Sequence, residues 1–365
     1  MSKVMGIINL MTDRDDFSSL TNDRCVAAIP FASNYRFIDF TLNNFIHSEI
    51  NEIAIFTHTK SRSLLNYLGS GLDWGLNTYK KGLYILPSSP DIIQQSDIDY
   101  FIKNWDCIEK SNAEHLLISG STFITNTSYQ SMMEQHISNN NDMTFLVTND
   151  TQKRSNSISV MSDVNGKVKE ISYHHNGALF TGVYMIKKEC LIQLIKKAKL
   201  TSCKQLINVI ITEFKQYNTE SYVYVDEYYY MDSSTQYYHC SMLLLNRNNY
   251  QNLMRKCKII KSKESHYSPT KYGKNATVCN SLVGSGCQLY GSIDHSILFQ
   301  GITIEKGATI KNSIIFDHCL IKSGAYIENA IVDKHSFISS KETIIGSIKS
   351  PILIAKQTNK LSSVM

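Results

Sequence analysis

The chain has 365 residues, of which 42% are hydrophobic, and carries a formal net charge of +5. This length predicts two domains, because it exceeds what one ordinary hydrophobic core organises. No apolar run reaches the roughly 18 residues that span a bilayer, the first residues enter an apolar strand without a cleavage site, and no arginine-rich stripe indicates nucleic acid. We therefore expect a cytoplasmic protein whose partners are neither membranes nor nucleic acids.

The nine cysteines are scattered along the chain and never form close pairs. Structural zinc sites and disulfide frameworks both require such pairs. We expect reduced, mostly buried thiols and no metal held by this chain.

Up to about residue 240, short β-branched runs alternate with longer helical patterns. The predicted strands are 4–10, 53–57, 115–119, 143–148, 181–186 and 221–225, and the predicted helices are 35–47, 128–138 and 188–199. This alternation is typical of a mainly parallel sheet covered by helices. We assign residues 1–245 to an α/β domain.

Residues 246–275 are polar and basic with few apolar positions. We interpret them as a linker or strap that enters a second domain. A solvated connection is the simpler interpretation, and an anion-binding patch is the alternative.

The second domain, residues 276–365, is predicted from a short repeat. Branched aliphatic residues recur five or six positions apart, at Val283, Leu289, Ile293, Leu298, Ile304, Ile310, Ile315, Ile321, Ile327, Val332, Ile338 and Ile344. A four-residue phrase, first present as Asn280-Ser281-Leu282-Val283, returns after steps of 15, 17 and 17 residues. A repeat this short fits a parallel β-solenoid with triangular coils, and Gly301, Gly307 and Gly324 fall at its corners. A β-sandwich would instead show alternation of period two.

Two stretches resemble a known family. The segment from Ile29 to Asn44, which begins Ile-Pro-Phe, is similar to the segment that follows the nucleotide loop in bacterial glucose-1-phosphate adenylyltransferases. The hexapeptide repeat, and above all Asn329 to Lys334, is similar to the last coils of the same family. The resemblance implies a Rossmann-like nucleotidyltransferase domain followed by a left-handed β-helix. It also implies a reaction of ATP with glucose 1-phosphate that gives ADP-glucose and pyrophosphate in the presence of magnesium.

The nucleotide loop departs from the family pattern. Residues 9–21 contain no glycine, whereas the family has a glycine-rich loop whose backbone amides surround the triphosphate. Aspartates at 13, 15 and 16 add negative charge there, and Arg14 is the only cation. We predict that this loop repels ATP.

Other family positions are lost as well. We count Asp16, Val26 and Ser121 as lost positions, because Val26 replaces a phosphate-binding lysine and Ser121 replaces a metal-binding aspartate. The glutamate-lysine pair that binds the sugar phosphate in the family is also missing, and His174 and His175 occupy its region. What the resemblance leaves is a vestigial substrate site formed by Arg14, Tyr35, Arg36, Asp39, Gly182 and Asp232. The first-turn residues Tyr35, Arg36 and Asp39 also fit simple helix capping.

This pattern of losses resembles the GlgD-type companion subunit of the family. We expect a regulatory chain without catalytic residues or a cofactor of its own, which joins a catalytic adenylyltransferase subunit in a hetero-oligomer, such as a tetramer, and responds to sugar-phosphate effectors. Magnesium would belong to the catalytic partner. Two alternatives stay open: an active sugar-phosphate nucleotidyltransferase with an altered loop, and an acyltransferase that uses His295, His318 or His335 as its base.

Overall fold

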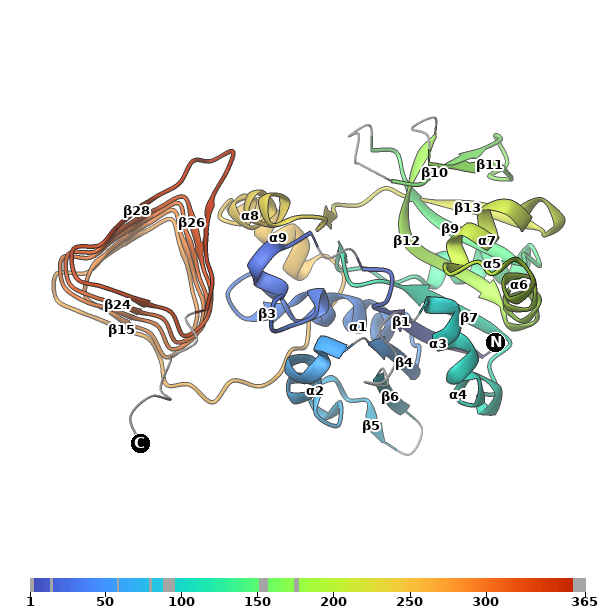
Figure 1. Ribbon diagram of the computed structural model, residues 1–365, viewed down its shortest axis with the longest axis horizontal. Helices are drawn as coiled ribbons and strands as arrows, with labels where there is room; N and C mark the ends of the chain where they lie inside the picture. Colours follow the sequence, from blue (N-terminus) through green and yellow to red (C-terminus); the bar gives the residue numbers. More distant parts are fainter. Residues whose placement is uncertain are drawn as a thin grey trace. The chain divides into compact units, whose positions relative to one another are not determined.

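The computed structural model describes residues 3–13, 16–57, 59–78, 81–87, 96–150, 157–173 and 177–356 (Figure 1). The chain forms two compact units that alternate along the sequence. The first unit comprises residues 1–13, 40–228 and 256–261, and the second comprises 14–39, 229–255 and 262–365. The domain limits predicted at residues 245 and 275 stay predictions.

The first unit is built on a mixed sheet with the order β11-β10-β12-β7-β1-β4-β6-β5, and β9 lies between β12 and β13. Strands β7, β1, β4 and β6 run parallel, which confirms the predicted parallel centre. Strand β12 is antiparallel to β7 and β9, a reversal that local patterning did not predict. The strands of this unit are β1 (Val4–Asn9), β4 (Glu52–Thr57), β5 (Asn77–Thr78), β6 (Lys81–Pro87), β7 (His115–Ser119), β8 (Phe123–Ile124), β9 (Met143–Thr148), β10 (Ser159–Ser162), β11 (Val168–Ser172), β12 (Ala178–Lys187) and β13 (Thr219–Tyr224).

Helices cover the sheet and close its core. The helices and 3₁₀ turns are α1 (Phe37–His47), η3 (Thr59–Ser61), α2 (Arg62–Leu68), η4 (Leu72–Trp74), α3 (Asp97–Lys103), α4 (Trp105–Lys110), α5 (Gln130–Ser138), α6 (Lys188–Thr201), α7 (Leu206–Glu213) and η5 (Phe214–Gln216). Buried residues of α3, α4, α6 and α7 form one hydrophobic cluster with β1, β4, β7 and β9. Helix α1 lies close to β1, since a Cβ atom on Gly6 would stand 2.5 Å from the ring of Phe45.

The predicted elements of this unit are confirmed, with ends that differ by up to three residues. The strand predicted at 115–119 is β7, and the helix predicted at 188–199 is α6, which continues to Thr201. Local hydrophobic periodicity fixes these elements because each has one face or both faces buried.

The second unit begins with short elements rich in aromatic residues. They are η1 (Ser18–Thr21), η2 (Val26–Ala28), β2 (Pro30–Phe31), β3 (Tyr35–Arg36), β14 (Tyr229–Tyr230), α8 (Ser234–Leu243) and α9 (Arg247–Arg255). Tyr237 of α8 packs edge-on or tilted against Phe31, Phe37 and Phe316, and its hydroxyl donates to the carbonyl oxygen of Pro30 at 2.8 Å. Tyr237 therefore packs inside the unit. Helix α9 shows that part of the predicted strap is helical.

The solenoid of the second unit is a left-handed parallel β-helix, as predicted, and Figure 1 shows its triangular coils along the axis. Its three sheets hold β15 (Lys271–Tyr272), β18 (Gln288–Leu289), β21 (Thr303–Ile304), β24 (Leu320–Ile321) and β27 (Phe337–Ile338); β16 (Thr277–Cys279), β19 (Ser292–Asp294), β22 (Thr309–Lys311), β25 (Tyr326–Glu328) and β28 (Thr343–Ile345); and β17 (Leu282–Val283), β20 (Ile297–Leu298), β23 (Ile314–Ile315), β26 (Ala330–Val332) and β29 (Ile352–Ile354). The repeating aliphatic residues stack in register, for example Leu289 on Ile304 and Ile304 on Ile321. All of them are buried except Val283, which is half-buried in the first coil.

The recurring four-residue phrase marks one corner of each coil. Its first residue, such as Asn280 or Asn312, has a positive φ, a conformation that asparagine tolerates better than most residues. The serine that follows forms a ladder, because the hydroxyl of Ser296 accepts from the backbone N–H of Ser313 at 3.1 Å. The phrase thus encodes a turn together with the hydrogen bonds that link successive turns. Among the described residues, no helix has the length and apolar character needed to cross a membrane.

Candidate functional site

The sheet of the first unit has a topological switch point at β1. The chain passes from β1 to β4 on one side and reaches β7 on the other side, and all three strands run parallel. Ligands of open α/β sheets bind in the crevice outside the carboxyl ends of the strands at such a point. The residues that follow β1 and β7 therefore define the candidate site.

The turn after β1 is held by its own side chains instead of glycines. The Asn9 side-chain oxygen accepts from the backbone N–H of Met11 at 3.2 Å, and the Thr12 hydroxyl donates to the Asn9 carbonyl oxygen at 3.0 Å. Such side-chain turns are typical of asparagine and threonine. The Met11 N–H is therefore already hydrogen-bonded, whereas a phosphate-binding loop leaves its backbone N–H groups free for the ligand.

Asp13 crosses from this turn to the loop after β7. Its carboxylate accepts from the backbone N–H of Ser121, at 3.0 Å from Oδ1, and from the Ser121 hydroxyl. Gly120 makes this approach possible, since a Cβ atom there would lie 2.5 Å from Asp13 Oδ1. The two loops of the crevice are thus fastened to each other by one carboxylate.

The environment of Asp13 disfavours its charge. Burial raises the pKa of Asp13 to about 6, while the two hydrogen bonds from Ser121 lower it in part. Ser121 is fully buried, so its N–H is enclosed by the contact with Asp13. Because a pKa of about 6 lies below neutral pH, Asp13 is still a carboxylate there, at a place where an anionic ligand would need a donor.

The residues at this site do not fit a magnesium ion. Magnesium in nucleotide sites is held by carboxylates together with substrate phosphates. Both Asp13 oxygens are engaged by Ser121, and Ser121 itself offers only a neutral hydroxyl. Within the described ranges, no three His, Cys, Asp or Glu side chains gather where they would hold a metal ion.

Gly182, the other predicted site residue in this unit, lies on β12. Its φ is +86°, in the stretch between Phe180 and Tyr184 where the pairing of β12 with β9 shifts register. Apart from its chain neighbours, no atom of the described residues lies within 4 Å of the position of its missing Cβ. Gly182 thus serves a bulge, a role that needs positive φ and not close packing.

The remaining predicted residues belong to the second unit. Tyr35 and Arg36 form β3, and the Asp39 carboxylate accepts from the backbone N–H of Arg36 at 2.8 Å, which closes the first turn of α1. Burial, followed by the charges of Tyr250 and Asp39, raises the pKa of Tyr35. These contacts match the capping role that the sequence allowed.

Three further positions have simple structural surroundings. Val26 is buried in η2, and the Asp16 carbonyl oxygen accepts from the backbone N–H of Ser234 at the start of α8. Asp232 accepts from the hydroxyl of Ser233, the residue that caps α8. Arg14, Asp15, His174 and His175 lie outside the described residues.

One charged cluster in the second unit could not be predicted from the sequence. Arg24 Nη2 lies 2.6 Å from Asp333 Oδ1, with both side chains almost fully buried. Burial lowers the pKa of the neighbouring Lys334, and the positive charges of Arg24, Arg36 and Lys356 lower it further. The Asp-Lys pair at 333–334 ended the segment that carried the family resemblance, but nothing local linked it to Arg24.

The corner histidines of the solenoid contact other side chains. His318 stacks on His335 with ring centroids 5.1 Å apart, and its Nε2 lies 2.6 Å from the Tyr267 hydroxyl. His295 Nδ1 lies 2.8 Å from the side-chain nitrogen of Asn280. These contacts give each histidine a structural role at its corner.

Comparison with known proteins agrees with this architecture. Residues 17–236 match the nucleotidyl transferase family, and residues 265–349 match the family described as GlmU-like, C-terminal hexapeptide. The chain is 31% identical over 315 residues to "Glycogen biosynthesis protein GlgD" of Bacillus subtilis (strain 168), which covers 85% of this chain and 83% of that protein. It is 28% identical over 314 residues to the protein of the same name from Geobacillus stearothermophilus, with the same coverage of 85% and 83%.

A catalytic relative is also similar. "Glucose-1-phosphate adenylyltransferase" of Geobacillus stearothermophilus is 28% identical over 307 residues, covering 80% of this chain and 79% of that protein. These matches confirm the resemblance found in the sequence. The chain belongs to the nucleotidyl transferase family and, within it, to the GlgD group that is related to the glucose-1-phosphate adenylyltransferases.

Proposed function

We propose that this chain is a regulatory subunit of glycogen biosynthesis, inactive or nearly inactive alone, that assembles with a catalytic glucose-1-phosphate adenylyltransferase chain. The relatives named for glycogen biosynthesis place the proposal in that process. The observation that carries it is the contact between Asp13 and Ser121 at the switch point.

The contact opposes nucleotide binding in two ways. It consumes the Ser121 N–H, a donor that a phosphate would require, and it leaves a carboxylate at the place where phosphate charge would accumulate. Two like charges about 4 Å apart repel by about 4 kcal/mol at an effective dielectric constant near 20. Phosphoryl-group chemistry depends on positioning the phosphate and on neutralising its charge. A crevice that presents a carboxylate and an occupied N–H group does neither.

The rest of the proposal concerns the partner. A chain that keeps the folded α/β unit and the β-helix, yet lacks a phosphate-binding loop, retains surfaces for assembly without the chemistry. The catalytic chain would supply the magnesium, and the hetero-oligomer, such as a tetramer, would be the active form.

Sugar-phosphate effectors are part of the same proposal. Burial and the repulsion from the charges of Arg24, Arg36 and Lys356 lower the pKa of Lys334, although the carboxylate of Asp333 raises it. A bound phosphate would relieve this repulsion. We therefore place the effector of the hetero-oligomer at Lys334.

The test uses this chain and a catalytic adenylyltransferase chain from the same organism, purified alone and after co-expression. We expect a stable complex whose rate of ADP-glucose formation, or response to a panel of sugar phosphates, differs from that of the catalytic chain alone. In the complex, Lys334→Gln should weaken the effector response. If the chains neither associate nor change each other's kinetics, the regulatory role is wrong.

A second measurement separates lost binding from lost chemistry. Calorimetry of this chain alone with ATP and magnesium should give no tight binding, and the double variant Asp13→Gly with Ser121→Asp should gain it. Thr12→Gly is the matched control, because it adds a glycine to the same loop but leaves the Asp13 carboxylate in place. Tight ATP binding by the unaltered chain would instead favour an active nucleotidyltransferase.

A further inference from the structure

One coil of the solenoid is shorter than its neighbours at one corner. The strands β18 and β19 are joined by Tyr290 and Gly291 alone, whereas the same corner of the other coils is formed by residues 273–276, 305–308, 322–325 and 339–342. This difference accounts for the first step of 15 residues in a repeat that otherwise steps by 17. The second coil therefore lacks the projecting turn that the other coils have.

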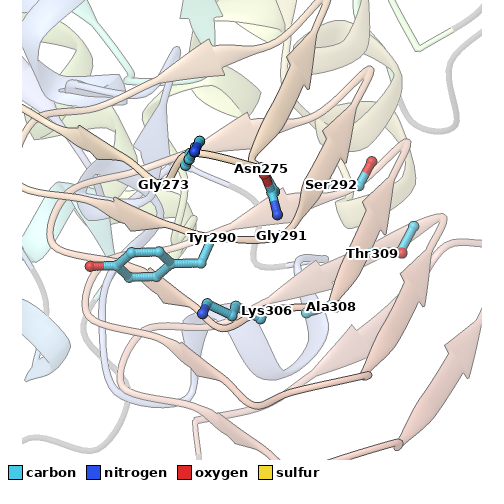
Figure 2. Close-up of a pocket in the computed structure, with 10 residues that line it drawn as sticks. Gly273, Asn275, Tyr290, Gly291, Ser292, Lys306, Ala308 and Thr309 are labelled. Atoms are coloured by element: carbon cyan, nitrogen blue, oxygen red, sulfur yellow. The ribbon is translucent and has the colours of Figure 1, made fainter.

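The missing turn leaves a notch in the surface of the solenoid. The notch has a volume of about 590 Å³ and is bordered by the turn of the first coil, at Lys274 and Asn275, and by that of the third coil, at Lys306 and Gly307. Its floor is Gly291, whose backbone lies so close to the next coil that a Cβ atom would stand 2.4 Å from the carbonyl oxygen of Ala308. Figure 2 shows Tyr290 and Lys306 on one side of the notch and Ser292 and Thr309 on the other. This volume falls in the range of roughly 300–1,000 Å³ that small-molecule sites occupy.

The lining of the notch is cationic and rich in hydroxyl groups. Lys274 and Lys306 stand on turns two coils apart, which is roughly 10 Å at the usual strand spacing. Ser292 and Thr309 are paired in register, so their hydroxyls follow one line along the sheet. Of the described residues that line the notch, none is acidic.

A carboxylate beside the notch is already engaged. Glu305 borders the adjoining hollow of about 340 Å³, but it forms an ion pair with Lys322 and accepts from the backbone N–H of Ser323 at 3.0 Å. The hydrogen bond and charge of Lys322 lower the pKa of Glu305. The lysines of the notch thus stay available for an external anion.

We propose that this notch binds a small phosphorylated molecule, with the phosphate held by Lys274 and Lys306 and the hydroxyl groups of the ligand held by Asn275, Ser292 and Thr309. Lysine binds phosphate as a point charge, and side-chain hydroxyls and amides provide directional hydrogen bonds to a sugar. The site is separate from the crevice at β1 and from Lys334, and it does not depend on the proposed subunit role.

The test is calorimetry on the full chain alone, with inorganic phosphate and glucose 1-phosphate as probes and glucose as the neutral control. We expect both phosphorylated probes to bind and glucose not to bind. The double variant Lys274→Gln with Lys306→Gln should weaken binding by roughly tenfold, since each lost charge-assisted contact removes part of the affinity. Lys341→Gln, at the matching turn of the last coil, should leave binding unchanged.

A second variant fills the notch without removing its charges. Insertion of Ser-Gly between Tyr290 and Gly291 completes the short corner, and it should abolish binding while both lysines remain. Circular dichroism and the melting temperature show whether the insertion variant folds. If it does not fold, the lysine double variant alone tests whether the notch binds phosphate. Unchanged binding of both phosphorylated probes in the lysine double variant, or equal binding of glucose and glucose 1-phosphate, would overturn the proposal.

Discussion

Arg24 and Asp333 lie 309 positions apart in the sequence and form a buried ion pair in the second unit. The guanidinium also lies 5.8 Å from the centre of the Phe316 ring. Through this pair, the segment after the first strand is joined to the fourth coil of the β-helix. Arg24 lies shortly before the Ile29–Asn44 stretch and Asp333 lies within Asn329–Lys334, so the pair joins the chain near both places in which the family resemblance was found.

Arg24→Met should destabilise the second unit strongly. It leaves Asp333 buried without its partner charge, which costs about 3–5 kcal/mol in comparable cases. Adding Asp333→Leu should recover much of the loss, because no buried charge then remains. Scanning calorimetry measures both variants, and Lys256→Met is the control, since the exposed pair of Lys256 with Asp226 contributes at most about 1 kcal/mol. If Arg24→Met and Lys256→Met lowered the melting temperature equally, the buried ion pair would not have the stabilising role assigned to it.

Asp13→Asn should make the protein more stable at neutral pH. The folded-state pKa of Asp13 is raised to about 6 from 3.8, so its favourable contribution is complete below pH 4 and is lost as the pH rises through 6. Asparagine keeps an acceptor for the Ser121 N–H and carries no charge. We expect a gain of about 1–2 kcal/mol at pH 7.5 and no difference at pH 4.

The melting temperature of both proteins between pH 4 and 8 checks this expectation. Asp163→Asn is the contrasting variant, because the hydrogen bond of Lys169 lowers the pKa of Asp163. Asp163→Asn should destabilise the protein at neutral pH, because it removes a negative charge that Lys169 stabilises. A constant difference between Asp13→Asn and the unaltered protein at every pH would show that Asp13 does not titrate in this range.

A buried histidine pair should make the first unit sensitive to acid. His136 lies within 3.1 Å of the His115 ring nitrogen and 2.8 Å from the Thr144 hydroxyl. Burial, and then the charge of His115, lowers the pKa of His136 to about 3. Its contribution to stability is therefore present above pH 6.5 and is lost as the pH falls towards 3.

His136→Gln should flatten this dependence by up to about 1.4 kcal/mol per pH unit, while lowering stability at pH 7 through its imperfect packing. Circular dichroism followed from pH 7 to pH 3 measures the acid transition. The exposed His266 provides the control His266→Gln. If both variants lose structure at the same pH as the unaltered protein, the pair does not control the transition.

Gly291→Ala should destabilise the solenoid although it adds a single methyl group. Besides the Ala308 carbonyl oxygen, the new Cβ would meet Ile304 Cγ2 at 2.9 Å, so adjacent coils must move apart. Overpacking of this kind costs about 1–3 kcal/mol. Urea unfolding monitored by circular dichroism compares it with Ser292→Ala at the next position, which should change stability by less than about 1 kcal/mol.

Much of the fold could be predicted because its signals are local. The hexapeptide repeat specifies the β-helix, since each aliphatic residue stacks on its equivalent in the next coil, as Ile293 does on Ile310. The same locality explains why strand β7 was predicted residue for residue, whereas the antiparallel course of β12 was not. A strand pattern records which faces are buried, but not the direction of its neighbour.

The sequence by itself determined the family, the order of the two folds and the absence of a glycine-rich loop after the first strand. Only the tertiary structure decided that Asp13 turns onto Ser121, that Arg24 pairs with Asp333, and that the short second coil leaves a notch between lysines. The physical reason is distance along the chain. Periodicity and loop composition act over a few residues, whereas a carboxylate finds its donor, or a cavity its lining, only when distant segments are brought together by the fold.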